Sequence, residues 1–150
     1  MQIFPQPNNR KNGEQPESSF RVILVDSSRA FLRAAGIFFL ANRGVASVET
    51  ITANKIDIHK VAQNPPNIFV LEYLSEDAAW LQTVRHLRQL MPKVYILILE
   101  NEVIPSLPEP VLEGIFSAGA NEVYSKSVLS LRFVQTLERA ESWIIAAHGK

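Results

Sequence analysis

Three short apolar runs, each ending in a carboxylate, constrain the fold of this chain most strongly. They occupy residues 21–26, 67–73 and 94–100, and their acids are Asp26, Glu72 and Glu100. Apolar runs of this length, bounded by polar residues or proline, are typical of strands buried on both faces of a sheet. They predict one parallel sheet with its acids near the C-terminal edge, where open α/β sheets place their sites.

The rest of the chain shows helical and strand patterns in turn. The expected strands are 21–26, 47–51, 67–73, 94–100 and 121–125. The first expected helix follows Ser27 and Ser28, which are good N-cap residues, and ends near Gly44. Four further helices are expected at about 54–63, 75–90, 110–117 and 129–147. Strands that alternate with helices predict a doubly wound α/β fold with a five-stranded parallel sheet.

Length and composition narrow the classes of function. A chain of 150 residues suits one domain. Its 15 basic and 15 acidic residues cancel, so nothing favours direct binding to nucleic acid. It has no cysteine, which excludes disulfides, thiolate catalysis and Cys-based zinc sites. Because it shows neither a signal-peptide pattern nor a membrane-length apolar run, we expect a soluble, cytoplasmic protein with no membrane contact.

The first 19 residues are polar, and Ile3 and Phe4 are their only large apolar side chains. Such a composition buries too little surface to offset the entropy lost on ordering. We therefore expect residues 1–19 to form a flexible N-terminal tail and residues 20–147 to form the folded domain. The alternative is that Ile3 and Phe4 form a docking peptide.

The runs RVILVDSSRAFLRAA, NIFVLEY, LRQLMPKVYILILE and VLEGIFSAGANEVYSK, in this order and spacing, resemble the receiver domain of bacterial response regulators. The resemblance covers about residues 20–145. It implies the flavodoxin-like topology of the chemotaxis regulators, with strand order 2-1-3-4-5. It also implies a role in two-component, phosphorelay-type signal transduction rather than in enzyme catalysis.

The site that the resemblance implies is degenerate. Asp26 matches the first of two acids in the family pattern, and Lys126 matches its lysine. Ser27 stands where the second acid is expected, Glu72 replaces the phospho-accepting Asp, and Glu100 replaces a Thr or Ser. The Pro that usually follows the lysine is Ser127, and the loop after the fourth strand looks longer than usual.

These departures predict a pseudo-receiver that acts without phosphorylation. Mg²⁺ demands near-octahedral oxygen ligands, and in-line phosphoryl transfer depends on exact placement of the accepting carboxylate. We expect no cofactor beyond weak Mg²⁺ binding at Asp26 and Glu72. Lys126 is the natural partner of the three acids, so the site is expected to be a fixed polar network. Because three acids face one cation, we expect one acid to point to solvent, one pKa to rise, or a cation to bind.

Three alternatives remain open at this point. Glu72 and Glu100 could lie on exposed strand ends and do nothing. The domain could be a working receiver that binds Mg²⁺ and accepts phosphate. The third alternative, a small α/β enzyme, lacks a credible pair of nucleophile and base. The three histidines share no metal-ligand spacing, and we expect none of them to bind a metal.

The last helix carries more apolar residues than one core-facing stripe needs. Phe133, Trp143 and Ile144 are the predicted interface residues. The surplus could contact a signalling kinase, a regulator or a DNA-binding protein. It could also form a homodimer through helix 4, strand 5 and helix 5, or fold back on its own domain. The sequence does not tell whether the chain is a fragment of a longer protein.

Overall fold

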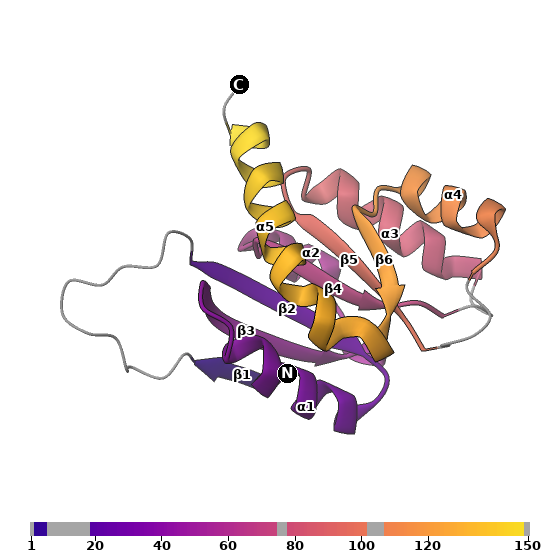
Figure 1. Ribbon diagram of the computed structural model, residues 1–150. Helices are drawn as coiled ribbons and strands as arrows, with labels where there is room; N and C mark the ends of the chain where they lie inside the picture. The colour runs from indigo at the N-terminus through magenta and orange to yellow at the C-terminus, as the bar shows by residue number, and fades with distance from the viewer. Residues whose placement is uncertain (1, 6–18, 75–77, 102–106, 149–150) are drawn as a thin grey trace.

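The computed structural model describes residues 2–5, 19–74, 78–101 and 107–148, which form one sheet flanked by helices (Figure 1). The strands are β1 (Gln2–Pro5), β2 (Phe20–Asp26), β3 (Val45–Thr52), β4 (Ile68–Glu72), β5 (Tyr95–Glu100) and β6 (Glu122–Ser125). The helices are α1 (Arg29–Leu40), α2 (Ile58–Gln63), α3 (Ala78–Leu90), α4 (Glu109–Ala118) and α5 (Leu129–His148). Two 3₁₀ turns, η1 (Ala53–Lys55) and η2 (Lys126–Val128), complete the described elements.

The sheet has the order β1-β3-β2-β4-β5-β6. The five strands from β2 to β6 are parallel to one another. Numbered among themselves, they have the order 2-1-3-4-5, which confirms the predicted flavodoxin-like topology. Strands β2, β4 and β5 lie in the middle, and the side chains of β4 and β5 are buried throughout. The sheet therefore brings the last residues of these three strands to one edge.

Strand β1, which the sequence analysis did not predict, lies in the expected flexible tail. β1 pairs antiparallel with β3, with Ile3 opposite Glu49, and it forms one edge of the sheet. The prediction for residues 1–19 is thus wrong for residues 2–5, because their backbone hydrogen bonds offset part of the ordering entropy. The rest of the predicted tail, apart from Ser19, lies outside the described residues.

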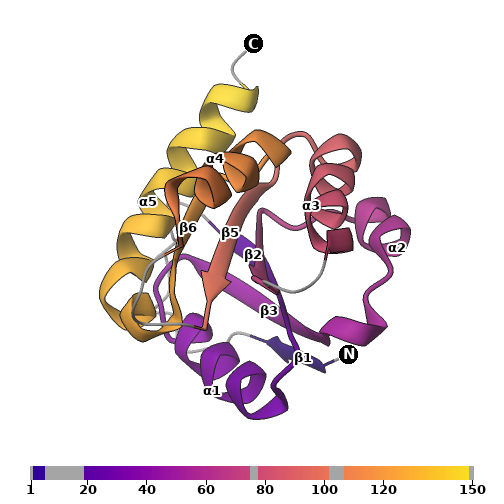
Figure 2. The same ribbon diagram turned by 90° about the vertical axis from the view of Figure 1, so that its right-hand side faces the viewer.

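Two apolar layers hold the helices against the sheet. α1 and α5 cover one face, where Phe39 and Phe133 stack at 4.3 Å between ring centroids. α2, α3 and α4 cover the other face, where the buried Trp80, Val84 and Leu87 of α3 pack on the central strands. Figure 2 shows α1 and α5 on one side of the sheet and α2 and α3 on the other.

Local chemistry sets the ends of several helices. Ser28 caps α1, and its hydroxyl accepts a hydrogen bond from the backbone N–H of Phe31. Gly119 ends α4 with a φ of 124°, as its position after the helix predicts. A Cβ at Gly119 would lie 2.6 Å from the Cβ of Arg88, so any larger residue would clash there. α2 is shorter than expected, because its predicted first turn is the 3₁₀ turn η1 and Asp57 caps the helix only afterwards.

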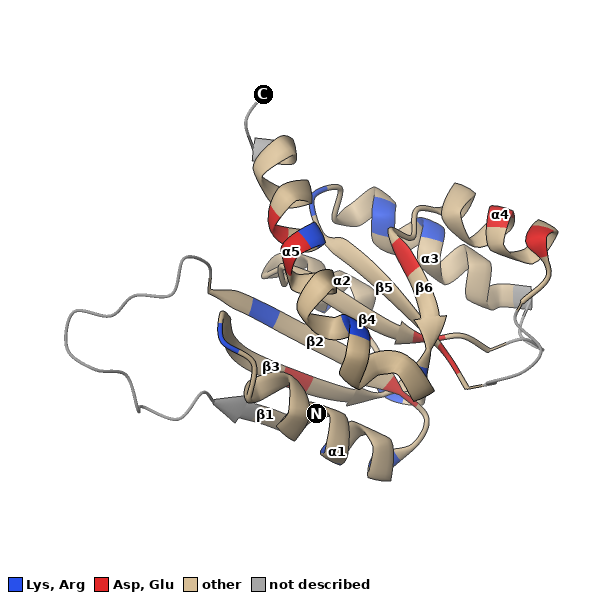
Figure 3. Cartoon of the chain, in the orientation of Figure 1, with Lys and Arg blue, Asp and Glu red and all other residues tan. Residues whose placement is uncertain are grey.

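Two further findings concern the described residues as a whole. None of their helices combines the length and the apolar character needed to cross a membrane. Figure 3 shows both signs of charge interspersed in this view, in line with the zero formal net charge.

Most of the long loop expected after β5 lies outside the described residues.

Candidate functional site

Three strand ends build a polar site at the C-terminal edge of the sheet. Asp26 ends β2, Glu72 ends β4, and Lys126 follows β6 directly. The Lys126 Nζ lies 2.7 Å from Asp26 Oδ2 and 3.3 Å from Glu72 Oε2. One ammonium group therefore bridges both carboxylates, the contact predicted for Lys126.

Four donors of the chain itself surround the Glu72 carboxylate. Oε1 accepts hydrogen bonds from the Ser27 backbone N–H at 3.0 Å and from the Ser27 hydroxyl at 2.7 Å. Oε2 accepts from Asn101 Nδ2 at 3.0 Å and from Lys126 Nζ at 3.3 Å. A carboxylate offers about four lone-pair positions. The acceptor capacity of Glu72 is therefore filled within the domain.

The pKa values of the two acids shift in opposite directions. Burial raises the pKa of Asp26 above its ordinary value of 3.8, and the hydrogen bonds from Lys126 and Ser28 offset only part of that rise. Burial also acts to raise the pKa of Glu72, but the hydrogen bonds from Asn101 and Ser27 and the charge of Lys126 together hold it below 4.5. One pKa in the acid cluster thus rises, which was one of the three expected outcomes.

Lys126 is shielded as well as paired. Its side chain is 15% exposed, and its Nζ lies 4.2 Å from the centroid of the Phe31 ring, in a cation–π contact. Phe31 lies in the first turn of α1, directly after the capped start of that helix. The ammonium is therefore enclosed by two carboxylates and an aromatic face.

Glu100 lies at the same edge of the sheet as Asp26 and Glu72. It ends β5 opposite Ser125 of β6, and only 8% of the residue is exposed. Glu72 is 4% exposed. The alternative in which both glutamates lie on exposed strand ends is therefore wrong, because neighbouring strands and helices cover them.

Sequence reasoning missed several partners of the site. Ser27 was predicted to be an N-cap, but it donates to Glu72 while Ser28 caps the helix. Asn101 was not singled out, although it directly follows the third of the acid-ended strands. Trp80 also belongs to the surroundings, because its Nε1 donates to the Glu72 backbone carbonyl at 2.7 Å.

The two acids expected to bind Mg²⁺ weakly are already paired with a lysine. Within the described ranges, no group of three or more His, Asp or Glu side chains is placed to hold a metal ion. The Lys126 ammonium lies between the two carboxylates that would have to bind one. His59 and His86 do meet, with ring centroids 5.3 Å apart, although their sequence spacing gave no sign of it.

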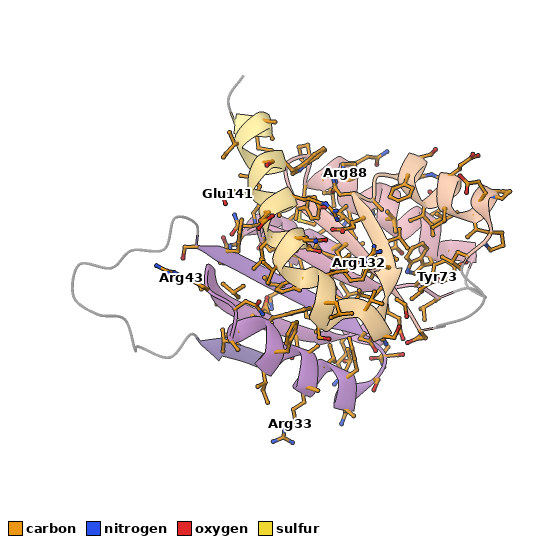
Figure 4. The ribbon with its side chains drawn as sticks, in the orientation of Figure 1. Arg33, Arg43, Tyr73, Arg88, Arg132 and Glu141 are labelled. Carbon is orange, nitrogen blue, oxygen red and sulfur yellow. The ribbon has the colours of Figure 1, made fainter. Side chains whose placement is uncertain are left out.

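The predicted interface residues of the last helix are mostly internal. Phe133 is fully buried against Phe39, so its assignment to an interface is wrong. Trp143 is partly buried: its Nε1 donates to the Lys93 carbonyl at 3.0 Å, and its ring faces the Arg88 guanidinium at 5.1 Å. Figure 4 shows Arg88 between α3 and α5. Ile144 is partly buried against the core beneath α5.

The exposed apolar residues of α5 are different ones. Leu131, Val134 and Ile145 are 79%, 57% and 62% exposed, respectively. They lie on the side of the helix away from Phe133 and Leu137, which face the core. The predicted surplus of apolar residues on this helix therefore exists, but other residues carry it.

Comparison with known proteins gives a likeness in structure only. No protein-family model matches the sequence, and no curated protein matches it. A solved two-component response regulator of the LuxR family from Aurantimonas sp. SI85-9A1 is similar, with a TM-score of 0.62 at 21% identity over 89% of this chain and 100% of that one.

Two further solved structures resemble the chain. A CheY-like response regulator receiver domain protein from Methanospirillum hungatei JF-1 has a TM-score of 0.62 at 16% identity, over 84% of this chain and 97% of that one. A putative pilus assembly-related protein from Burkholderia pseudomallei K96243 has a TM-score of 0.64 at 15% identity, over 82% and 90%. At these identities the likeness establishes the fold.

Proposed function

We propose that this chain, which has the fold of a response-regulator receiver domain, is a pseudo-receiver that signals through protein contacts without being phosphorylated. The observation that carries the proposal is the Glu72 carboxylate, whose oxygens accept from Ser27, Asn101 and Lys126. A carboxylate that accepts a phosphoryl group must offer a lone pair in line with the donor. Glu72 would have to break hydrogen bonds within its own domain before it could do so.

Two further features support this proposal. The lowered pKa of Glu72 reports a stabilised, weakly basic carboxylate, which is a poor nucleophile. Glu100 adds a third buried acid, after Asp26 and Glu72, at the edge where a transferred phosphoryl group would come to lie. Repulsion between this acid and a phosphoryl group would oppose the transfer, since both carry negative charge.

The network of Asp26, Glu72 and Lys126 would hold the domain in one signalling state. In this view the Glu72 side chain, one methylene longer than Asp, takes the place of a phosphorylated acceptor and engages Lys126 permanently. The output is contact with a protein partner in the cytoplasm, such as a signalling kinase, a regulator or a DNA-binding protein. No chemical step is required of the domain.

A titration with Mg²⁺ and then beryllofluoride tests the proposal. Backbone amide shifts at Asp26, Glu72 and Lys126, together with Trp80 fluorescence, report on the site because Trp80 donates to Glu72. We expect no saturable change at millimolar Mg²⁺, with or without beryllofluoride. A saturable response that Asp26→Asn abolishes would favour the alternative, a working receiver that binds Mg²⁺ and accepts phosphate.

A designed variant provides the matched control for that titration. Replacing Ser27 by Asp and Glu72 by Asp restores the second acid and the phospho-accepting Asp of the family pattern and removes the Ser27 hydroxyl. We expect this double variant to respond to Mg²⁺ more strongly than the natural protein. Equal responses of the two proteins would mean that the Glu72 contacts do not block the site.

A further inference from the structure

A cleft of about 620 Å³ opens on the sheet beside α2, at the edge formed by β1, β3 and β2. Three neighbouring strands form its floor, where Ile3, Glu49 and Ile23 stand side by side in register. α2 has only six residues and lies next to α3 (Figure 2), and its residues Lys60 and Val61 line one wall of the cleft. The volume falls in the range of small-ligand sites, roughly 300–1,000 Å³.

The middle of the cleft is apolar. Ile23 and Ile51 line the floor, and Val61 of α2 lines the wall. One end of the cleft is closed by Arg21, whose guanidinium donates to the Asn64 side chain at 3.2 Å and to the Pro65 carbonyl at 3.0 Å. An apolar body can therefore lie along the strands between Arg21 and the opposite end.

Charged groups flank this apolar floor. Glu49 is partly exposed in the floor, and Lys55 and Lys60 are exposed on the wall. Within the part of the chain that the structure describes, none of the three takes part in an ion pair. Asp57 also lines the cleft, but its carboxylate accepts from the Lys60 backbone N–H and caps α2. The cleft thus presents Glu49, Lys55 and Lys60 to a ligand, beside Asp57 and Arg21, which hold contacts within the domain.

The spacing of these charges indicates the length of a ligand. From Glu49 to the end of β3 at Thr52 the strand advances three residues, about 10 Å, and Lys55 follows in the next turn. An extended peptide of three residues also spans about 10 Å. Its ammonium group would meet Glu49, and its carboxylate would meet Lys55 and Lys60. Its side chains would contact Val61 and Ile3, which is 61% exposed.

We propose that this cleft binds a zwitterionic, apolar peptide of two or three residues. An apolar anion alone would leave Glu49 beside it without a partner, and an apolar amine alone would do the same to Lys55 and Lys60. Only a ligand with both charges satisfies both sides of the cleft. The site is separate from the cluster of Asp26, Glu72 and Lys126, so its test does not depend on the state of that cluster.

The experiment compares three probes on the full chain by backbone amide shifts at Ile51 and Val61. They are the tripeptide Leu-Ala-Leu, its N-acetylated form, which lacks the ammonium, and its C-terminal amide, which lacks the carboxylate. We expect saturable shifts with the free tripeptide and affinities about tenfold lower for each blocked form. Glu49→Gln should remove the advantage over the acetylated form, and Lys60→Gln should reduce the advantage over the amide.

Glu113→Gln and Lys93→Gln serve as controls, because both residues are exposed and lie outside the cleft. They should leave the affinity for Leu-Ala-Leu unchanged. Equal binding of the three probes would overturn the proposal and leave only non-specific apolar contact. The absence of saturable shifts, or shifts confined to other surfaces, would overturn it as well.

Discussion

Replacing Asp26 by Asn should stabilise the domain at neutral pH. Asp26 is fully buried, and burial raises its pKa despite the ion pair with Lys126. The raised pKa means that the folded state holds the neutral acid better than the charged one. Asn resembles that neutral form, and its oxygen can accept from the Ser28 backbone N–H as Asp26 does. Its amide nitrogen then takes the place of Oδ2, so Lys126 loses this contact and keeps Glu72 as its partner.

The sign and the pH range follow from linkage. The folded pKa of Asp26 lies above its unfolded value of 3.8, so ionisation costs stability as the pH rises through 3.8 and then through the folded pKa. The penalty is absent well below pH 3.8 and reaches its full size above the folded pKa. We expect Asp26→Asn to raise the free energy of unfolding at pH 7 by roughly 0.5–2 kcal/mol, a size typical of single substitutions.

Urea denaturation followed by circular dichroism at pH 7 and again below pH 3.8 measures this effect. Asp57→Asn is the matched control, because Asp57 is an exposed acid that caps α2 and Asn caps a helix equally well. The control should change stability little at either pH. A less stable Asp26→Asn protein at pH 7 would show that the ion pair with Lys126 outweighs the cost of burial, contrary to our reasoning.

Three further predictions concern stability and can be measured by the same denaturation assay. Lys126→Met should lower the free energy of unfolding by about 3–5 kcal/mol at pH 7, because it leaves two buried carboxylates without their cation. This loss should shrink as the pH falls and both carboxylates become protonated, and an equal loss at neutral and acidic pH would contradict this. Glu122→Ala should lower the free energy of unfolding by about 2–4 kcal/mol, because Glu122 accepts from the Tyr95 hydroxyl and from the guanidinium of Arg139 on α5. A change near zero would argue against that network. Gly119→Ala should cost more than about 1 kcal/mol, because of both the positive φ and the contact with Arg88, whereas Gly114→Ala, which meets nothing within 4 Å, should be neutral or stabilising.

The arrangement of the parallel sheet could be predicted because its signals are local. Runs of buried apolar residues mark β2, β4 and β5, and the order of strands and helices leaves few topologies. β1 could not be predicted, because a four-residue edge strand containing Gln2 and Pro5 shows no buried run and depends on its partner β3. The late start of α2 could not be predicted, because the spacing of its apolar residues fits one helix over 54–63 as well as a 3₁₀ turn followed by a short helix.

The candidate site could be predicted in part. The pairing of Lys126 with Asp26 and Glu72 followed from the three strand ends. The saturation of Glu72 did not, because it depends on Asn101 and on which of two adjacent serines caps α1. These details are set by three-dimensional placement rather than by residue type.

The error at the last helix has a clearer cause. Phe133, Leu137, Ala140 and Ile144 recur at helical spacing and form the stripe that faces the sheet. Had this period been applied to α5, Phe133 would have been assigned to the core and Leu131, Val134 and Ile145 to the surface. The helical spacing of these residues distinguishes core from surface positions, whereas the number of apolar residues does not.

The most direct test of the central claim is the intact mass of the protein after incubation with acetyl phosphate and Mg²⁺. A working receiver domain treated in the same way shows that the reagent is active. Our account predicts no phosphoryl adduct, because the Glu72 carboxylate is engaged by Ser27, Asn101 and Lys126. A stoichiometric adduct that maps to Glu72 or Asp26 would contradict the account and identify the chain as a phospho-accepting receiver.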